Sequence, residues 1–527
     1  MPPPSSFSNG YVTDVAYLPG FYPAMAPAQM RYVASLQGVC PPKADRSFSY
    51  LELGCGFGST LLALAAANPQ GEFTGIDFMP VHTDRIARES AASGIDNLRV
   101  ISADFTALPS DVGKFDFIVL HGVFSWISPE LRRCVLELIR RHLKPGGLVE
   151  VTYNCMPGWA SLLPVRTLLR HFAEQVDGDS LERVTFALKE VERLRKADIP
   201  LFHDQPLAVQ LVDKLLAANP HYVAHEYLNE HWTAFEAGDV QEQFKGIGLR
   251  YAGRLPVHHN SWQLCAQQTF ADQFSGLDES RLEMLKDHHA NVMFRWDIYS
   301  TERGVTWSAR ERAEAIADIC FRLDSPDVTL PHTVKYGPVE AGINGPPHDK
   351  LLEVMGQSSW TLPELLAHPE LSSFSPELLT EAIDTGVALK LFRVEGGPID
   401  AAVNSLDRIT PGSLRLPLRF NQRAMACENL TNEQIVLAST RTQSGHPIGD
   451  LYTLVLDELM CSGSDAIEVR VADRLIAADK HLREQKTGRP ITDRTEMVHA
   501  AREICGDFLG RILPELFRQG IIEINGN

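Results

Sequence analysis

Residues 51–59 read LELGCGFGS, and this stretch decides how the first third of the chain folds. An apolar strand pattern, FSYLEL (48–53), runs directly into glycines at alternate positions, Gly54, Gly56 and Gly58, and a helical pattern follows. Glycine lets the backbone turn sharply and lets a ligand approach where another residue would carry a Cβ atom. The start of the next helix offers unpaired N–H groups to a carboxylate or another polar group. The stretch therefore predicts a binding site at the end of a buried strand.

The residues that follow alternate between strand and helix patterns. Further strands are expected at EFTGID (72–77), LRVISA (98–103), FDFIVL (115–120) and LVEVTY (148–153), with helices near 59–68, 80–93 and 129–143. Four of the five strands are almost continuously apolar, as strands covered on both faces are. This alternation predicts a parallel, doubly wound α/β sheet with right-handed connections. FKGIGLRYAGRLPV (244–257) and MFRWDIYS (293–300) read as strands that return to complete it.

The chain has 527 residues, which is too long for one hydrophobic core. Polar sequence rich in Pro and Gly near 325–349 reads as a linker. Residues 360–394 read as short helices followed by a strand, which resembles a winged-helix unit. We therefore expect an N-terminal lid segment (1–46), the doubly wound core (47–160), a helical insertion with a possible role in dimerisation (161–243), a segment that completes the sheet and carries inserted helices (244–324), a regulatory or middle domain (350–440) and a helical C-terminal domain (441–527).

Composition excludes several classes of protein. The formal net charge is −18, and residues 1–155 contribute little of it, with 12 basic and 14 acidic side chains. Such acidity disfavours binding to nucleic acid and to anionic membranes, and it suits basic partners or solubility alone. No apolar run approaches the roughly 20 residues that cross a bilayer, and the first residues lack a secretory signal pattern. Nine scattered cysteines without a C-x-x-C pair favour reduced thiols, so we expect a cytoplasmic protein.

Three features distinguish the glycine-rich turn from that of dinucleotide-binding proteins. The spacing is G-x-G-x-G, with Glu52 two residues before the first glycine. Asp77 ends the second strand, where its carboxylate could accept hydrogen bonds from both hydroxyls of a ribose. The third strand leads into Asp104 and Phe105, an acceptor and an aromatic edge for an adenine. Each feature alone has an ordinary explanation, since Asp often caps helices, but their order favours an adenosine-containing ligand.

Residues 47–153 resemble the class I S-adenosylmethionine-dependent methyltransferase fold, including the turn KPGG (144–147) before the fifth strand. The resemblance implies a seven-stranded sheet whose last strand is antiparallel, with S-adenosylmethionine bound and S-adenosylhomocysteine released. The three glycines would line the methionine part of the cofactor, Asp77 would hold the ribose, and Asp104 and Phe105 would contact adenine. The full set of expected cofactor contacts is Glu52, Gly54, Gly56, Gly58, Asp77, Phe78, Asp104, Phe105, His121 and Tyr17.

A narrower resemblance extends to about residue 300. It rests on NGYVTDVAY (9–17), IVLHGVFSWI (118–127), YNCMPGW (153–159), HEYLNEHW (225–232) and NVMFRWDIY (291–299). These motifs resemble bacterial methyltransferases with a methyltransferase regulatory domain, among them the rickettsial protein lysine methyltransferases. The resemblance implies methyl transfer to lysine side chains of a protein substrate, and it is compatible with a homodimer. The alternatives are a small-molecule methyltransferase with regulatory accessory domains, or a non-catalytic sensor that binds the cofactor.

Candidate acceptor residues follow the ends of the fourth and fifth strands, because ligands of open α/β sheets lie beyond those ends. His121 is a candidate general base, or a histidine that shapes the cofactor pocket. Tyr153 and Trp126 are candidates for a channel that binds a cation through aromatic rings, or for packing, and Trp159 is expected to pack. Two further groups belong to this prediction: the lid tyrosines Tyr11, Tyr17 and Tyr22, and His225, Glu226 and Tyr227, which rest on the resemblance.

Metal-dependent chemistry is not expected. The adjacent histidines His258-His259 and His288-His289 point to different faces in regular structure, and no Cys or acid stands at ligand spacing from them. The chain has no P-loop, nucleophile elbow or kinase signature. Methyl transfer from a sulfonium needs no metal, which agrees with that absence.

Overall fold

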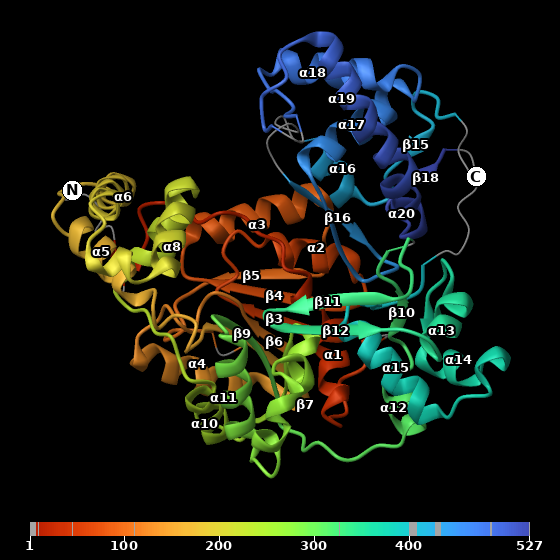
Figure 1. Ribbon diagram of the computed structural model, residues 1–527, viewed down its shortest axis with the longest axis horizontal. Helices are drawn as coiled ribbons and strands as arrows, with labels where there is room; N and C mark the ends of the chain where they lie inside the picture. Colours follow the sequence, from red (N-terminus) through yellow and green to blue (C-terminus); the bar gives the residue numbers. More distant parts are fainter. Residues whose placement is uncertain are drawn as a thin grey trace.

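A central seven-stranded sheet organises the computed structural model, with helices on both of its faces and further units around it (Figure 1). The structure describes residues 7–8, 10–44, 46–109, 111–325, 327–399, 408–426, 434–484 and 487–525. Parts of the expected lid segment, middle domain and C-terminal domain therefore lie outside the described residues. No helix among the described residues is both long enough and apolar enough to span a bilayer.

The sheet has the strand order β5-β4-β3-β6-β7-β9-β8. The first five strands pair in parallel, and β9 runs antiparallel to both β7 and β8. The doubly wound sheet and its antiparallel last strand are thus confirmed, and both returning segments complete it as predicted. The strands are β3 Phe48–Leu53, β4 Gly71–Asp77, β5 Leu98–Ser102, β6 Phe115–Leu120, β7 Leu143–Asn154, β8 Arg250–Leu255 and β9 Phe294–Ser300.

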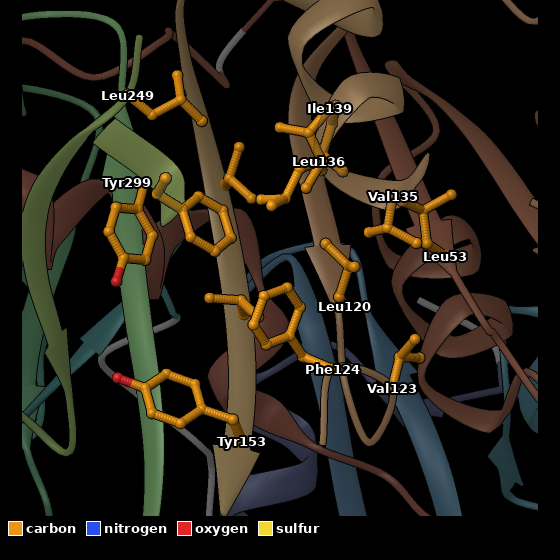
Figure 2. Close-up of a cluster of buried hydrophobic side chains, with 14 of the residues drawn as sticks. Leu53, Leu120, Val123, Phe124, Val135, Leu136, Ile139, Tyr153, Leu249 and Tyr299 are labelled. Carbon is orange, nitrogen blue, oxygen red and sulfur yellow. The ribbon is translucent and has the colours of Figure 1, made fainter. Parts of the chain in front are cut away.

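Alternate residues of the central strands enter two different cores, which explains why these strands are apolar throughout. Phe117 packs with the helices α1, α2 and α3, whereas its neighbour Ile118 packs with α4 and α10 on the opposite face. Figure 2 shows the second of these cores, in which side chains of α4 such as Leu136 meet strand residues such as Leu120. Burial of each such side chain contributes about 1.5–3 kcal/mol. The covering helices are α1 Pro27–Leu36, α2 Ser59–Ala67, α3 Pro80–Ser93, α4 Pro129–His142 and α10 Ala237–Gly246.

Helix α4 illustrates how local sequence sets these elements. The Ser128 side chain accepts a hydrogen bond from the Leu131 N–H at 3.1 Å, and Pro129 occupies the first helical position. Arg140 and Arg141 in the last turn complement the negative end of the helix dipole. The sequence of α4 therefore sets where the helix begins and ends. Its apolar face packs against the sheet.

The helical insertion forms a separate core at one edge of the molecule, where Figure 1 shows α5, α6 and α8 together. Val12 and Val15 of the N-terminal segment are buried within it. The N-terminal segment is therefore held by the helical insertion as well as by the sheet. The elements are β1 Phe7–Ser8, β2 Tyr11–Val12, α5 Leu163–Ala173, α6 Ser180–Lys196, α7 Pro200–His203, α8 Pro206–Ala217, α9 Pro220–Val223 and a π-helical turn, Ala224–Leu228.

The prediction of a linker near residues 325–349 was wrong. Residues His332–Tyr336 (β11) and Val339–Ile343 (β12) form a regular antiparallel hairpin. The Pro- and Gly-rich composition of this stretch hid the alternation of side chains that is typical of paired strands. The stretch 360–394 forms short helices and then a strand, as expected, and that strand (β14) pairs with β10 in a three-stranded sheet. This part comprises α11 Glu279–Ala290, α12 Ala309–Ala315, β10 Cys320–Leu323, α13 His348–Met355, β13 Trp360–Thr361, α14 Leu362–Ala367, α15 Pro376–Ala388 and β14 Phe392–Glu395.

The C-terminal unit rests directly on the helices that follow the glycine-rich turn (Figure 1). Its β16–β17 hairpin packs on α2, and its helix α16 packs on α3, where Arg423 pairs with Glu89 at 3.2 Å. The Asn68 side chain at the end of α2 donates a hydrogen bond to the Gln443 carbonyl at 3.1 Å. The elements are β15 Leu414–Arg415, α16 Arg419–Met425, β16 Ile435–Ser439, β17 Ser444–Ile448, α17 Asp450–Ser462, α18 Ile467–Ala477, α19 Arg494–Asp507, α20 Leu513–Arg518 and β18 Glu523–Ile524.

A cluster of buried ion pairs joins α11 to strands β8 and β9. Asp287 accepts from Arg254 at 2.5 Å and from Arg295 at 2.7 Å, and each of these side chains is at most 1% exposed. Glu283 pairs with the same two arginines and with Lys286. Burial alone would raise the pKa of Glu283, but the neighbouring Arg254 and Lys286 lower it to about 2. Glu283 therefore stays ionised, and the ion pairs fix α11 against the end of the sheet.

We predict that Asp287→Asn lowers the free energy of unfolding by about 3–5 kcal/mol, because it leaves two buried arginines short of one counter-charge. The measurement is the midpoint of unfolding in urea followed by tryptophan fluorescence. Glu242→Gln is the matched control, since the Glu242–Lys245 pair is 65% and 70% exposed and should be worth less than about 1 kcal/mol. Equal shifts for the two variants would contradict the structural role of the buried cluster.

Candidate cofactor and acceptor site

One cavity of about 460 Å³ lies beyond the carboxyl ends of the sheet strands. Its size is in the range of small-molecule binding sites. Its walls come from the glycine-rich turn, the ends of β4, β6 and β7, the N-terminal segment and the π-helical turn. All ten residues that the sequence predicts to contact the cofactor line this cavity.

The three glycines of the turn all have left-handed backbone conformations, with φ between +52° and +72°. At Gly54 a Cβ atom would lie 2.5 Å from Val123 of the loop after β6, so no larger residue fits. At Gly56 a Cβ would meet nothing within 4 Å, because that side of the glycine faces the open cavity. The turn therefore places bare backbone where a ligand can approach it closely.

Asp77 connects this turn to the end of the second strand. Its carboxylate accepts hydrogen bonds from the Gly56 N–H at 2.8 Å and the Met79 N–H at 2.9 Å, and it lies 3.1 Å from Nδ1 of His82. The side chain is 5% exposed and lines the cavity. It is thus held rigidly with lone pairs available for the hydroxyls of a ribose.

Two buried polar groups on the cofactor side have no hydrogen-bond partner within the described part of the chain. They are Oε2 of Glu52 and Nε2 of His82, and both residues line the cavity. Burial, and then the charge of Asp77, raises the pKa of Glu52 to about 8. An unpaired carboxyl oxygen suits the ammonium group of the methionine part of S-adenosylmethionine, and an unpaired imidazole nitrogen suits a further polar group. These residues therefore fit the cofactor.

His121 lies between aromatic rings at the centre of the cavity. Its ring stacks on Trp296 at 4.6 Å between centroids and lies 3.9 Å from the ring of Tyr22, while Nδ1 is 3.3 Å from the Thr152 hydroxyl. Burial lowers the pKa of His121 to about 3. An imidazole with so low a pKa accepts protons poorly near neutral pH, and this favours the shaping role over the role of a base.

The acceptor side of the cavity is mainly aromatic. Trp126 and Trp159 both line it, and Trp159 also packs on Trp232 at 4.7 Å between centroids. Phe294, Trp296 and Tyr222 complete the wall. Within the described residues, Nε1 of Trp126 and Nδ2 of Asn154 are buried in this region without a hydrogen-bond partner. Two free donors beside aromatic rings are suited to a substrate that carries an acceptor such as a carbonyl oxygen.

Tyr153 and Tyr227 do not line the cavity. Tyr153 is fully buried beneath it in the core shown in Figure 2, where its hydroxyl donates a hydrogen bond to Asp297 at 2.6 Å. The side chain points to the face of β7 that packs on α10, so the predicted catalytic contact is corrected to a packing role. Tyr227 is buried in the core of the helical insertion.

The three lid tyrosines reach the cavity from the N-terminal segment. Tyr17 donates a hydrogen bond to Oε1 of Glu226 at 2.8 Å, and Tyr11 lies 3.2 Å from Nδ1 of His225. Tyr22 is held through its backbone N–H, which donates to the Thr60 hydroxyl of α2 at 3.0 Å. The segment therefore closes the cavity by specific contacts with the π-helical turn and with α2.

The described residues that line the cavity include acids but no Lys or Arg. Of the described side chains that line it, four are acids, Glu52, Asp77, Asp104 and Glu226, and none is Lys or Arg. Such a site favours cationic ligands. The described residues hold no group of three or more His, Cys, Asp or Glu that could bind a metal.

Sequence reasoning missed several lining residues, above all Trp296, Phe294, Asn154 and His82. His82 could have been found, because it stands one turn into the helix that follows Asp77. Trp296 and Phe294 lie on the last strand, which reaches the site only because β9 inserts between β7 and β8. That position follows from the topology and has no local signal.

Two family models match the chain. Residues 51–147 match the model described as a methyltransferase domain, and residues 219–300 match one described as a predicted methyltransferase regulatory domain. The second match includes both the π-helical turn and β9. Residues from both matched regions therefore line the same cavity.

Two of the similar proteins match nearly the whole chain, and a third matches part of it. A relative described as an uncharacterised protein of Synechocystis is 26% identical over 524 residues, 98% of this chain and all of that protein. A second, also uncharacterised, from Rickettsia prowazekii, is 29% identical over 41% of this chain and 86% of its own length. The solved structure of PKMT2 from Rickettsia typhi in complex with AdoHcy matches with a TM-score of 0.67 and 18% identity, over 96% of this chain and 99% of that one. This last likeness shows a shared fold.

We predict that Asp77→Ala weakens binding of S-adenosylmethionine by about 100-fold, because two hydrogen bonds to a buried charge are lost and the turn is released. Isothermal titration calorimetry measures the affinity. Asp84→Ala, an exposed acid on the same helix as His82, should bind normally. Unchanged affinity of the Asp77 variant would refute the ribose contact.

We also predict that a substitution in the C-terminal unit weakens cofactor binding. A Cβ atom at Gly445 of the hairpin would lie 2.6 Å from the ring of Phe21, which precedes Tyr22 of the cavity wall. Overpacking by Gly445→Val costs about 1–3 kcal/mol, so we expect affinity for S-adenosylmethionine to fall about tenfold. Gly449→Ala is the control, since a Cβ there meets nothing within 4 Å. Equal affinities for the two variants in calorimetry would contradict this connection.

Proposed function

The chain is a class I S-adenosylmethionine-dependent methyltransferase with a methyltransferase regulatory domain, and we propose that it methylates lysine side chains of a protein substrate. The observation that supports this proposal most strongly is the wall of the cavity, which combines aromatic rings with carboxylates, Glu226 among them, and has no Lys or Arg among the described lining residues. A lysine side chain has an apolar stem and a cationic tip, and both parts match this surface. The resemblance of the motifs to the rickettsial protein lysine methyltransferases supports the same acceptor.

When bound, the cofactor supplies an electrophilic methyl group on a positively charged sulfur. Methyl transfer is then a displacement in line, and the protein contributes position and the exclusion of water. Asp77 and the glycine-rich turn orient the adenosine and methionine parts, as their rigid hydrogen bonds allow. Tyr22, His121 and Trp296 pack on one another in the wall of the cavity, and this aromatic wall helps to exclude bulk water.

A protein acceptor also agrees with the size and charge of the accessory units. Most of the net charge of −18 belongs to residues after 155, which build the insertion, the middle unit and the C-terminal unit. An acidic surface of this extent attracts a lysine-rich protein over a long range. A small metabolite would need only the cavity.

The proposal predicts that the purified chain transfers tritium from methyl-labelled S-adenosylmethionine to protein bands of a lysate from its source organism. Acid hydrolysis of the labelled bands should yield methylated lysine, identified by mass spectrometry. The Asp77→Ala variant should label the same bands at least about 100-fold more slowly, because it binds the cofactor poorly.

Two other outcomes would overturn the lysine assignment. Label that appears only in the small-molecule fraction would indicate a metabolite methyltransferase. Label in protein hydrolysates at a residue other than lysine would keep the enzyme class and change the acceptor.

A further inference from the structure

Glu226 is a half-buried carboxyl group that the binding of the cofactor does not explain. It lies on the π-helical turn Ala224–Leu228 and lines the cavity, at a kind of backbone irregularity that is frequent at functional sites. Its Oε1 accepts a hydrogen bond from Tyr17 at 2.8 Å. The chain thus brings an acid from the regulatory domain to a cavity whose cofactor side already has three acids of its own.

The surroundings of Glu226 contain no basic group with which it pairs among the described contacts. Its negative charge raises the pKa values of five tyrosines around it, after the larger effect of their own burial. Tyr227 is buried, and the other four, Tyr11, Tyr17, Tyr22 and Tyr222, are half-buried. The adjacent His225 is neutral, because burial lowers its pKa to about 4. These tyrosines and His225 are therefore uncharged near pH 7.

Burial raises the pKa of Glu226 itself to about 7, and the hydrogen bond from Tyr17 opposes part of this rise. A carboxyl group with this pKa can both accept and release a proton under physiological conditions. The other candidates are less suitable. His121 has a pKa of about 3, Asp77 is occupied by the glycine-rich turn, and Glu52 lies at the foot of that turn.

We propose that Glu226 is the catalytic base that takes the proton from the ammonium group of the lysine acceptor, and that Tyr17 positions it. This inference rests on the proposed lysine acceptor and names the group that makes it nucleophilic. An unperturbed lysine has a pKa near 10.4, so almost none of it is neutral at pH 7 unless a base and a desolvated site assist.

The step balances as follows. An N–H bond of the lysine ammonium breaks, and its proton forms an O–H bond with the Glu226 carboxylate. The freed nitrogen lone pair forms a bond to the methyl carbon, while the electron pair of the carbon–sulfur bond stays on the sulfur and neutralises its charge. Glu226 then loses its proton to solvent before the next transfer.

The position of Glu226 can be tested with the two cofactor forms alone. A sulfonium beside a carboxyl group favours its ionised form, whereas the neutral sulfur of S-adenosylhomocysteine does not. With a pKa of about 7, Glu226 should release up to about half a proton at pH 7 when S-adenosylmethionine binds. Calorimetry in buffers of different ionisation enthalpy measures this release.

We expect Glu226→Gln to remove this release for S-adenosylmethionine and to leave the proton balance for S-adenosylhomocysteine unchanged. Any protons that the ligands themselves gain or lose on binding are the same for the variant and the wild type, so they cancel in the comparison. Glu52→Gln should alter both titrations, because Glu52 faces a part that the two ligands share. Glu230→Gln, an exposed acid four residues further along the segment, should alter neither. A release with S-adenosylmethionine that persists in Glu226→Gln would overturn the proposal.

A kinetic test uses the protein band that the labelling experiment identifies. The wild type needs ionised Glu226, so kcat/KM should fall as the pH drops below about 7. Glu226→Gln should lower kcat/KM about 100-fold at pH 7, and its rate should recover steadily toward pH 10 as free lysine loses its proton. Tyr17→Phe removes a hydrogen bond that lowers the pKa of Glu226. In this variant the fall of kcat/KM at low pH should therefore begin at a higher pH.

The outcomes separate this inference from the proposed function. If no lysine is labelled but the proton release depends on Glu226, the acceptor assignment fails and the position of Glu226 stands. If lysine is labelled but Glu226→Gln keeps the wild-type pH profile, the base is another group. An unchanged affinity for S-adenosylhomocysteine shows in each case that the variant is folded.

Discussion

The site depends first on the carboxylate of Asp77. It accepts N–H groups from Gly56 and Met79, and so it ties the turn after the first strand of the sheet to the start of the helix after the second. The left-handed glycines need this support, because a turn with bare backbone has no side chains of its own to pack. The same interaction leaves the carboxylate facing the cavity. One buried acid thus shapes the turn and is placed to hold the ribose.

A second constraint fixes the opposite wall. The ion pairs of Asp287 and Glu283 with Arg254 and Arg295 hold α11 to the last two strands, and Arg295 follows Phe294 of the cavity directly. Buried ion pairs are weak evidence for net stability but strong determinants of geometry, since removing one partner is costly. The ion pairs therefore hold in place the strand that carries the aromatic residues Phe294 and Trp296 of this wall. The matched regulatory domain includes this cluster, and so belongs to the site as much as to its surroundings.

The remaining wall comes from the N-terminal segment, which is anchored at three places. Val12 and Val15 are buried in the helical insertion, Tyr17 binds the π-helical turn, and Phe21 meets the C-terminal hairpin at Gly445. The first two anchors belong to the helical insertion, and the third belongs to the C-terminal unit. Because Tyr22 follows Phe21 and lies against His121, displacement of the C-terminal unit would also displace Tyr22 in the cavity wall. The accessory units are thus connected to the site by packing.

Local sequence determined the parallel core and the glycine-rich turn, and it predicted residues that line the cavity, because strand periodicity, glycine conformation and acids at strand ends are encoded within short windows. It also indicated His121 and the lid tyrosines, but not their roles. The hairpin at 332–343 was hidden by its composition, and Tyr153 was misplaced because one-residue alternation along β7 turns its ring away from the cavity. On β9, Arg295 and Asp297 are charged and yet buried, because α11 supplies Asp287 as a partner for Arg295, and Arg295 in turn pairs with Asp297. Only the tertiary structure decided that Tyr17 meets Glu226 across 209 residues and that Trp296 stacks on His121, since such contacts depend on strand order and on the path of the N-terminal segment.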